Sequence, residues 1–153
     1  MKINITKAVL KDIPSMQTLV APEIESGVIL VRSDDEIATN IRSYILAKDN
    51  DEIVGFCALH IHAPSLAEVR SLIVKETHRA NGIGEKLIKQ AMDEANTLGL
   101  QKVLSLTYKQ SFFEKLGFVE IPKESLPEHK IWADCIKCKH FPVCNEVSLI
   151  KTL

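Results

Sequence analysis

The stretch AEVRSLIVKETHRANGIGEKLI, residues 67–88, decides the expected fold of this chain. Its first eight residues are rich in apolar and β-branched types, so they predict a strand over 67–74. From Ile83 onward, apolar residues recur at helical spacing as far as Leu98, and Gly99 follows at the position that commonly ends a helix. A glycine-bearing turn therefore joins an apolar strand directly to a long amphipathic helix.

This turn has the features of an anion-binding loop. Gly82 and Gly84 carry no side chain where a ligand would approach the backbone. The N–H groups of the first helical turn point out of the helix end, and together with the helix dipole they attract negative charge, to which Arg79 and Lys86 add. The alternative is a glycine turn that merely starts a helix, but its place between strand and helix favours a phosphate cradle.

The rest of the chain predicts a mixture of strands and helices. Ser33 and Glu36 form a capping box that starts a helix with Ile37, Ile41 and Ile45 on one face. The order of elements predicts an α/β (α+β) fold with one mixed, mostly antiparallel sheet flanked by helices. We expect a single domain over residues 1–153 with a cysteine-rich tail at 129–153. Periodicity predicts further strands at 3–8, 44–48, 53–61, 102–106, 118–121 and 147–151, and helices after Asp12 and over 111–116.

The composition of the 153 residues excludes several classes of protein. Hydrophobic residues make up 46% and charged residues 25%, so a disordered chain is not expected. The 19 Lys and Arg residues balance 20 Asp and Glu residues, which argues against nucleic-acid binding. No apolar run reaches the roughly 18 residues that span a membrane. Polar residues interrupt the N-terminal seven, so no signal peptide is expected. We expect a cytoplasmic location, where the four cysteines are thiols or metal ligands.

Residues 67–84 resemble motif A of the GNAT acetyltransferases, in which a strand precedes R/Q-x-x-G-x-G/A. The stretch FFEKLGF, residues 112–118, resembles the C-terminal signature of the same family, in the right order and at about the right distance. The resemblance implies the GNAT fold and acetyl-CoA as co-substrate. The residues that it places around the coenzyme are Leu72, Ile73, Val74, Arg79, Ala80, Asn81, Gly82, Ile83, Gly84 and Glu85.

A narrower resemblance links the chain to the acetyltransferase domain of N-acetylglutamate synthases. It implies acetylation of the α-amino group of L-glutamate, the first step of arginine biosynthesis, by a stand-alone domain without the amino-acid kinase domain and its arginine feedback site. Another amino acid, a polyamine or a protein N-terminus stays open as acceptor, and so does homodimer formation. The alternative from another class is a non-catalytic sensor of acetyl-CoA or metal. The stretches that carry this resemblance are 27–33, 82–87, 106–107 and 126–128.

Acetyl transfer to an amine needs a base, and our hypothesis for it is Glu68. It lies eleven residues before Arg79, which matches the place of the glutamate base in several acetyltransferases. A carboxylate there accepts the ammonium proton directly or through a water. The alternative is a salt bridge with Arg70, since strand alternation puts both side chains on one face. The resemblance assigns the oxyanion to a backbone N–H of this strand, at Leu72 or Ile73.

The general acid departs from the family pattern. Phe113 stands where many members carry a tyrosine, and a phenyl ring cannot donate a proton. Tyr108, Ser111 and no dedicated acid stay open, since a CoA thiolate is a tolerable leaving group with a model thiol pKa of about 8.5.

An enzyme that acetylates an amino acid needs a side chain that binds the carboxylate of the acceptor. The resemblance places Arg32 there, and a guanidinium fork suits bidentate carboxylate binding. The alternative is a surface arginine near a helix N-terminus, which is electrostatically unfavourable. Arg70 and Lys130 are weaker candidates for a second carboxylate.

The tail holds a compact set of metal-ligating residues, namely Cys135, Cys138, His140 and Cys144. Three thiols and an imidazole suit a tetrahedral zinc site. Structural zinc sites more often join two separated knuckles, so reduced cysteines that order the tail remain the alternative.

The cysteine and the histidines outside the tail are not expected to bind a metal. Cys57 lies on an apolar strand and is expected in the core. His60 and His62 are expected beside a turn and solvated, and His78 is expected in the phosphate loop, near the coenzyme or simply exposed.

Overall fold

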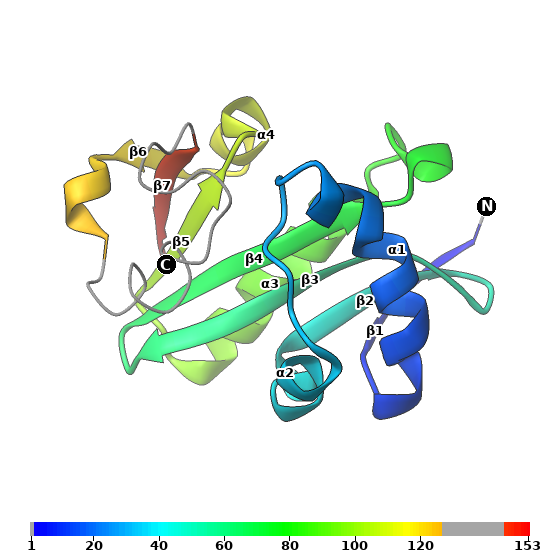
Figure 1. Ribbon diagram of the computed structural model, residues 1–153. Coiled ribbons are helices and arrows are strands. Elements are labelled where there is room, and N and C mark those ends of the chain that lie inside the picture. The colour runs from blue at the N-terminus through cyan, green and yellow to red at the C-terminus, as the bar shows by residue number, and fades with distance from the viewer. Residues whose placement is uncertain (1, 127–145) are drawn as a thin grey trace.

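A computed structural model describes residues 2–126 and 146–153. Its strands form one seven-stranded sheet in the order β1-β2-β3-β4-β5-β7-β6 (Figure 1). The pair β4–β5 is parallel and each other neighbouring pair is antiparallel, so the predicted mixed sheet is confirmed. The strands are β1 (Ile3–Lys7), β2 (Tyr44–Asp49), β3 (Glu52–Ala63), β4 (Leu66–Val74), β5 (Lys102–Thr107), β6 (Val119–Ile121) and β7 (Val147–Thr152).

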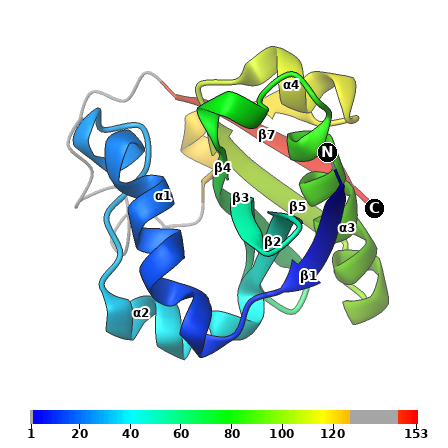
Figure 2. The same ribbon diagram turned by 90° about the vertical axis from the view of Figure 1, so that its right-hand side faces the viewer.

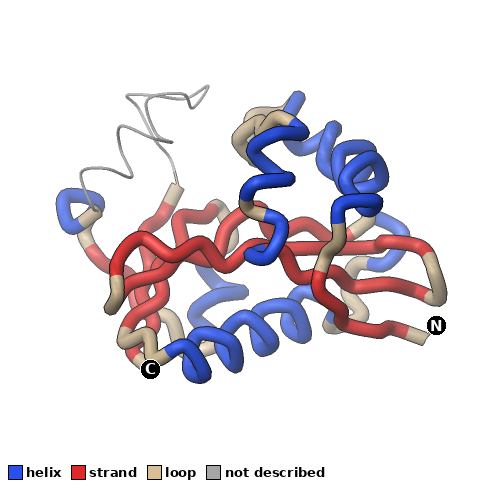
Figure 3. Tube along the Cα trace, turned by 90° about the horizontal axis from the view of Figure 1, so that it is seen from below, coloured by secondary structure: helices blue, strands red, loops and turns tan. Residues whose placement is uncertain are grey.

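Helices cover both faces of the sheet, which lies between them in Figures 2 and 3. Two N-terminal helices lie on one face and the long predicted helix lies on the other. The α-helices are α1 (Ile13–Glu25), α2 (Asp34–Thr39), α3 (Ile83–Leu98) and α4 (Gln110–Lys115). None of the helices in the described ranges is long and apolar enough to cross a bilayer.

Strand β2 shows why the centre of the sheet is apolar on both sides. Ile45 and Ala47 belong to the core cluster under α3, whereas Tyr44 and Leu46 belong to the cluster under α1 and α2. Successive side chains of a strand point to opposite faces, so a strand covered on both faces reads as a continuous apolar run.

The prediction of one helix that carries Ile37, Ile41 and Ile45 is correct at its start and wrong beyond Thr39. Its start is correct, because the Ser33 hydroxyl accepts a hydrogen bond from Glu36 N at 3.1 Å. The helix ends at Thr39, and the Asn40 side-chain amide donates to the Glu36 carbonyl at 2.9 Å. Ile45 instead pairs with Cys57 in the β2–β3 ladder. Backbone pairing with β3, across the short turn that joins the two strands, outweighs a local helical spacing of three isoleucines.

A wedge opens between the two parallel strands. β4 and β5 pair only from Leu66↔Lys102 to Glu68↔Leu104 and then separate. Further along β4, Ser71 and Leu72 together face one residue of β3, and Ser71 has a φ of 60°. This is a β-bulge, which bends its strand and leaves an extra residue outside the ladder. The bulge therefore lies beside the wedge.

Candidate active site

The loop between β4 and α3 adopts an unusual backbone. Ala80 and Gly82 have left-handed φ angles of 65° and 75°, and Gly82 is the N-cap of α3. A Cβ at Gly82 would meet nothing within 4 Å, so a left-handed backbone and open space coincide there. A Cβ at Gly84 would lie 3.3 Å from the Phe112 ring. The two glycines therefore have different roles, since Gly84 also allows α4 to pack against α3.

A groove of about 460 Å³ runs along this loop between α3 and α4. With the exception of Ile73 and Asn81, the residues expected at the coenzyme line it. Ile73 lines the wedge instead, and the Asn81 side-chain amide donates to the carbonyls of His78 and Arg79, at 3.1 Å each. The lining residues are Leu72, Val74, His78, Arg79, Ala80, Gly82, Ile83, Gly84, Glu85, Lys109, Phe112, Lys115 and Leu116.

Two side-chain contacts tie this loop to the rest of the fold. Arg79 donates to the Val74 carbonyl at 3.0 Å, and its Nη2 lies 3.2 Å from Glu23 Oε1 on α1. His78 Nε2 lies 2.9 Å from Asp49 Oδ2 at the end of β2. The hydrogen bond from His78 holds the pKa of Asp49 below its usual value. The guanidinium of Arg79 is thus shared between the loop and α1.

The wedge forms a second cavity next to the groove, lined by residues 69–74 of β4 and 105–107 of β5. Tyr108 lines it and is 40% exposed. Phe113 also lines it, is buried, and makes edge contacts with Phe112 and Phe118. The residue that replaces the family tyrosine therefore packs in the core at the wall of the wedge.

Glu68 lies at the closed end of the wedge, in the last pair of the β4–β5 ladder. The residue is 1% exposed, and its Oε1 lies 2.9 Å from His62 Nε2 on β3. The expectation that His62 is solvated is wrong, because its side chain is only 3% exposed. β3 continues to Ala63, past its expected end, and an irregularity in the register between Ile61 and Ala63 leaves His62 beside the Glu68 side chain.

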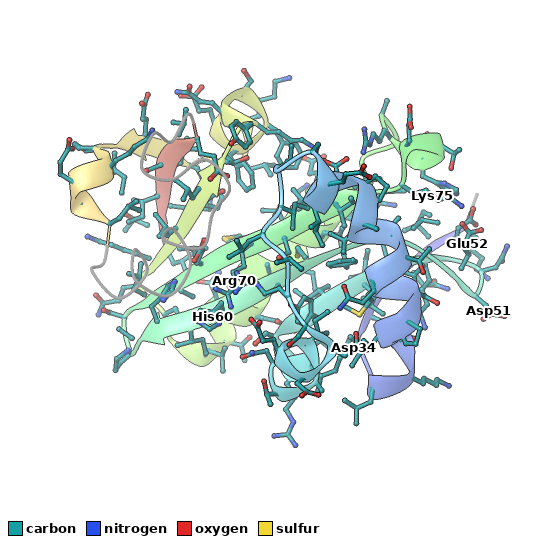
Figure 4. All side chains as sticks on the ribbon, in the orientation of Figure 1. Asp34, Asp51, Glu52, His60, Arg70 and Lys75 are labelled. Carbon is teal, nitrogen blue, oxygen red and sulfur yellow. The ribbon has the colours of Figure 1, made fainter. Side chains whose placement is uncertain are left out.

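A second cross-strand contact lies beside this one. Arg70 Nη2 lies 3.1 Å from His60 Nδ1, and Figure 4 shows the two side chains together on β3 and β4. The rings of His60 and His62 meet edge to face at 4.9 Å. The signal for this cluster is present in the sequence as two i, i+2 pairs, which flank the turn between β3 and β4.

Arg32 and Arg70 both lie near the hydroxyl of Tyr44. Arg32 lines a small cavity with Tyr44 and Ser71, and its side chain is 14% exposed, so it is not a surface arginine. Its Nη1 lies 3.7 Å from Glu36 Oε2. Burial raises the pKa of Tyr44, and the positive charges of Arg32 and Arg70 act in the opposite direction. The fold thus places two arginines that are far apart in the chain within electrostatic reach of one tyrosine.

The remaining predicted ligands lie outside the described residues. They are Lys130, Cys135, Cys138, His140 and Cys144. Within the ranges 2–126 and 146–153, no cluster of three or more His, Cys, Asp and Glu side chains is placed to hold a metal. Cys57 is buried as predicted, and burial raises the pKa of its thiol to about 12.

Residues 13–118 match the Acetyltransferase (GNAT) family. The chain therefore belongs to this family and is an acyltransferase. It is 34% identical over 149 residues to an uncharacterized N-acetyltransferase of Chlorobaculum tepidum, covering 97% of this chain and 96% of the relative. It is 27% identical over 128 residues to the amino-acid acetyltransferase of Neisseria meningitidis, covering 82% of this chain but only 29% of that protein.

Solved structures share the fold. The N-acetylglutamate synthase of Neisseria gonorrhoeae, in complex with coenzyme A and N-acetyl-glutamate, superposes with a TM-score of 0.89 at 24% identity, covering 100% of this chain and 35% of that protein. A Mycobacterium tuberculosis protein in complex with CoA gives a TM-score of 0.84 at 21% identity, covering 98% and 99% of the two chains. The chain spans about a third of the Neisseria gonorrhoeae synthase that it matches.

Proposed function

We propose that the chain transfers the acetyl group of acetyl-CoA to the α-amino group of L-glutamate. The observation that carries the proposal is that Arg70 lines the wedge and Arg32 lines the small cavity that shares Ser71 with it, while Glu68 lies in the last strand pair before the wedge opens. An amine substrate with two carboxylates matches two guanidinium groups and one buried carboxylate. The likeness to amino-acid acetyltransferases supports the same class of acceptor.

The α3–α4 groove suits the diphosphate and pantetheine arm of the coenzyme. The left-handed residues Ala80 and Gly82 turn the backbone into the N-terminus of α3, where N–H groups and the helix dipole favour anions. Lys109 and Lys115 line the same groove and add positive charge. Since the groove and the wedge share Leu72 and Val74, one extended ligand can occupy both. When bound, acetyl-CoA supplies a thioester for acyl transfer.

Residues around the wedge are suited to remove the ammonium proton, to stabilise the negative charge on the acetyl oxygen and to protonate the CoA thiolate. Glu68 accepts one proton from the ammonium group, and the amine nitrogen then attacks the thioester carbon. The C–N bond forms, the C–S bond breaks so that the CoA thiolate leaves, and the second proton of the nitrogen passes to solvent. A backbone N–H at Leu72 or Ile73, beside the bulge, donates to the acetyl oxygen as negative charge develops. Tyr108 is the described wedge residue suited to protonate the thiolate, and release without a dedicated acid remains the alternative.

An acceptor screen tests the proposal. The purified chain is mixed with acetyl-CoA and with L-glutamate, other amino acids, a polyamine or an N-terminal peptide. Free thiol and the mass of the product are then measured. We expect the largest kcat/KM and a singly acetylated product with L-glutamate. A larger kcat/KM with a polyamine or peptide overturns the glutamate assignment, and coenzyme binding without turnover of any amine overturns the enzymatic proposal.

Arg32→Ala tests the acceptor site within the same assay. Loss of a charged hydrogen bond is worth about 1.5–3 kcal/mol, so we expect the KM for glutamate to rise by about 10–100-fold. The KM for acetyl-CoA should change little. Arg42→Ala is the matched control, because Arg42 is an exposed arginine just beyond α2. An equal effect of Arg32→Ala on both substrates argues against its assigned role.

A further inference from the structure

We infer that His62 is the positioning residue of Glu68 and fixes its carboxylate, next to the point where β4 and β5 separate, through the Nε2–Oε1 hydrogen bond. The inference rests on the proposed role of Glu68 as the base. It assigns a role in acetyl transfer to a histidine that lies outside both recognised motifs, at the far end of β3.

The burial of the two side chains makes this contact important. The side chains of His62 and Glu68 are 3% and 2% exposed, so water cannot replace a lost partner easily. A buried carboxylate is costly unless hydrogen bonds satisfy it. The distance of 2.9 Å lies in the range of a well-formed bond between nitrogen and oxygen. The bond therefore both stabilises the carboxylate and restricts its rotation.

The chemistry of the pair determines where the proton lies. An ionised carboxylate has only acceptor atoms, so the Nε2 atom of His62 must carry the hydrogen that is shared with Glu68 Oε1. This holds for the neutral ring protonated at Nε2 and for the charged ring. A donor that holds one carboxylate oxygen sets the direction of the other oxygen, and proton transfer depends on that direction.

The surroundings of His62 hold its ring in place. The ring of His60 packs edge to face against it at 4.9 Å, and His60 in turn contacts Arg70 at 3.1 Å. Arg70, His60, His62 and Glu68 thus form a continuous row across the β3–β4 hairpin. One end of this row is the proposed base and the other is a proposed acceptor-binding arginine.

Kinetics of four variants test the inference. His62→Leu removes the donor, and we expect kcat to fall by up to about 100-fold, the cost of a misplaced catalytic group, with little change in the affinity for CoA. His62→Gln keeps an amide N–H near the position of Nε2, so it should restore most of the lost kcat. In the Glu68→Gln background, His62→Leu should cause little further loss, because His62 acts through Glu68.

Three outcomes overturn the inference. They are an equal loss from His62→Leu with and without the Glu68 carboxylate, no rescue by a folded His62→Gln, and a fall in CoA affinity that matches the fall in kcat. If His62→Leu does not fold, His62→Gln still decides, because it must retain activity close to that of the wild-type protein.

Nitrogen NMR of the imidazole rings separates failure of this inference from failure of the proposed function. We expect the His62 ring to be protonated at Nε2 at neutral pH, and its resonances to shift on Glu68→Gln. An unprotonated Nε2, or resonances unchanged by Glu68→Gln, overturns the contact itself. A wild-type protein that turns over no amine, yet shows the expected resonances, overturns the base role of Glu68 and leaves the hydrogen bond established.

Discussion

From the ion pair between Glu23 of α1 and Arg79 of the β4–α3 loop, we predict that Glu23 weakens the proposed binding of the coenzyme. The two groups lie 3.2 Å apart, and their side chains are 26% and 48% exposed. A diphosphate in the α3–α4 groove competes with the Glu23 carboxylate for the same guanidinium, and the two anions also repel each other. Glu23→Gln keeps the shape of the side chain and removes the charge, so it should tighten the binding of CoA.

The size of this effect follows from the exposure of the pair. Partly exposed ion pairs are worth about 0.2–1 kcal/mol, because water and salt screen them. The dissociation constant for CoA should therefore fall by at most about fivefold. Isothermal titration with CoA measures it, and the gain should shrink as the salt concentration rises. Glu25→Gln is the matched control, since it removes the same charge two residues further along α1.

The double variant identifies the route of the effect. If Glu23 acts through Arg79, Glu23→Gln should change the affinity for CoA much less in an Arg79→Ala background. Unchanged or weaker binding in the single variant would refute the competition between Glu23 and the diphosphate. An equal gain from Glu25→Gln would show that overall charge is responsible.

Three further predictions follow from single positions. Gly82→Ala places an L-residue at a φ of 75°, so it should lower the free energy of unfolding by about 1–2 kcal/mol in chemical denaturation, and an unchanged value would refute the strain. The hydrogen bond from His78 is the main cause of the lowered pKa of Asp49, so the ionised carboxylate stabilises the folded protein. This stabilisation is fully present above the unfolded-state pKa, about 3.9, and it is lost as the pH falls through the lower folded-state pKa. Asp49→Asn should therefore lower the Tm at neutral pH, and the difference from wild type should shrink in acid. Cys57, buried and with a pKa of about 12, should resist alkylation in the native protein and react after unfolding, as peptide mass mapping would reveal.

The strand–turn–helix unit over residues 67–98 was predictable because its signals are local. The alternation over 67–74, the glycines and the helical spacing up to Leu98 each report on a few neighbouring residues, and the structure has the strand, turn and helix there. Gly99, which ends α3 with a φ of 82°, was predicted on the same basis. Backbone preferences and side-chain periodicity act over short ranges, so they can be read from one segment.

The contacts around Glu68 and Arg70 were less predictable because they cross from one strand to the next. His60 and His62 look like residues beside a turn, and their burial against Arg70 and Glu68 depends on the length and register of β3. The helix that was expected to continue to Ile45 fails for a related reason, since Ile45 pairs with β3. In both cases, pairing between two neighbouring strands overrides the pattern within one segment.

By itself, the sequence determined the strand–turn–helix unit, the mixed sheet and membership of the acetyltransferase family, since these depend on local order and on recognisable motifs. Only the tertiary structure decided the wedge between β4 and β5, the placing of Arg32 and Arg70 within electrostatic reach of Tyr44, and the hydrogen bond between His62 and Glu68. Strand register and the burial of charged groups depend on how separate segments pack. That packing is a property of the whole chain, and no single stretch contains it.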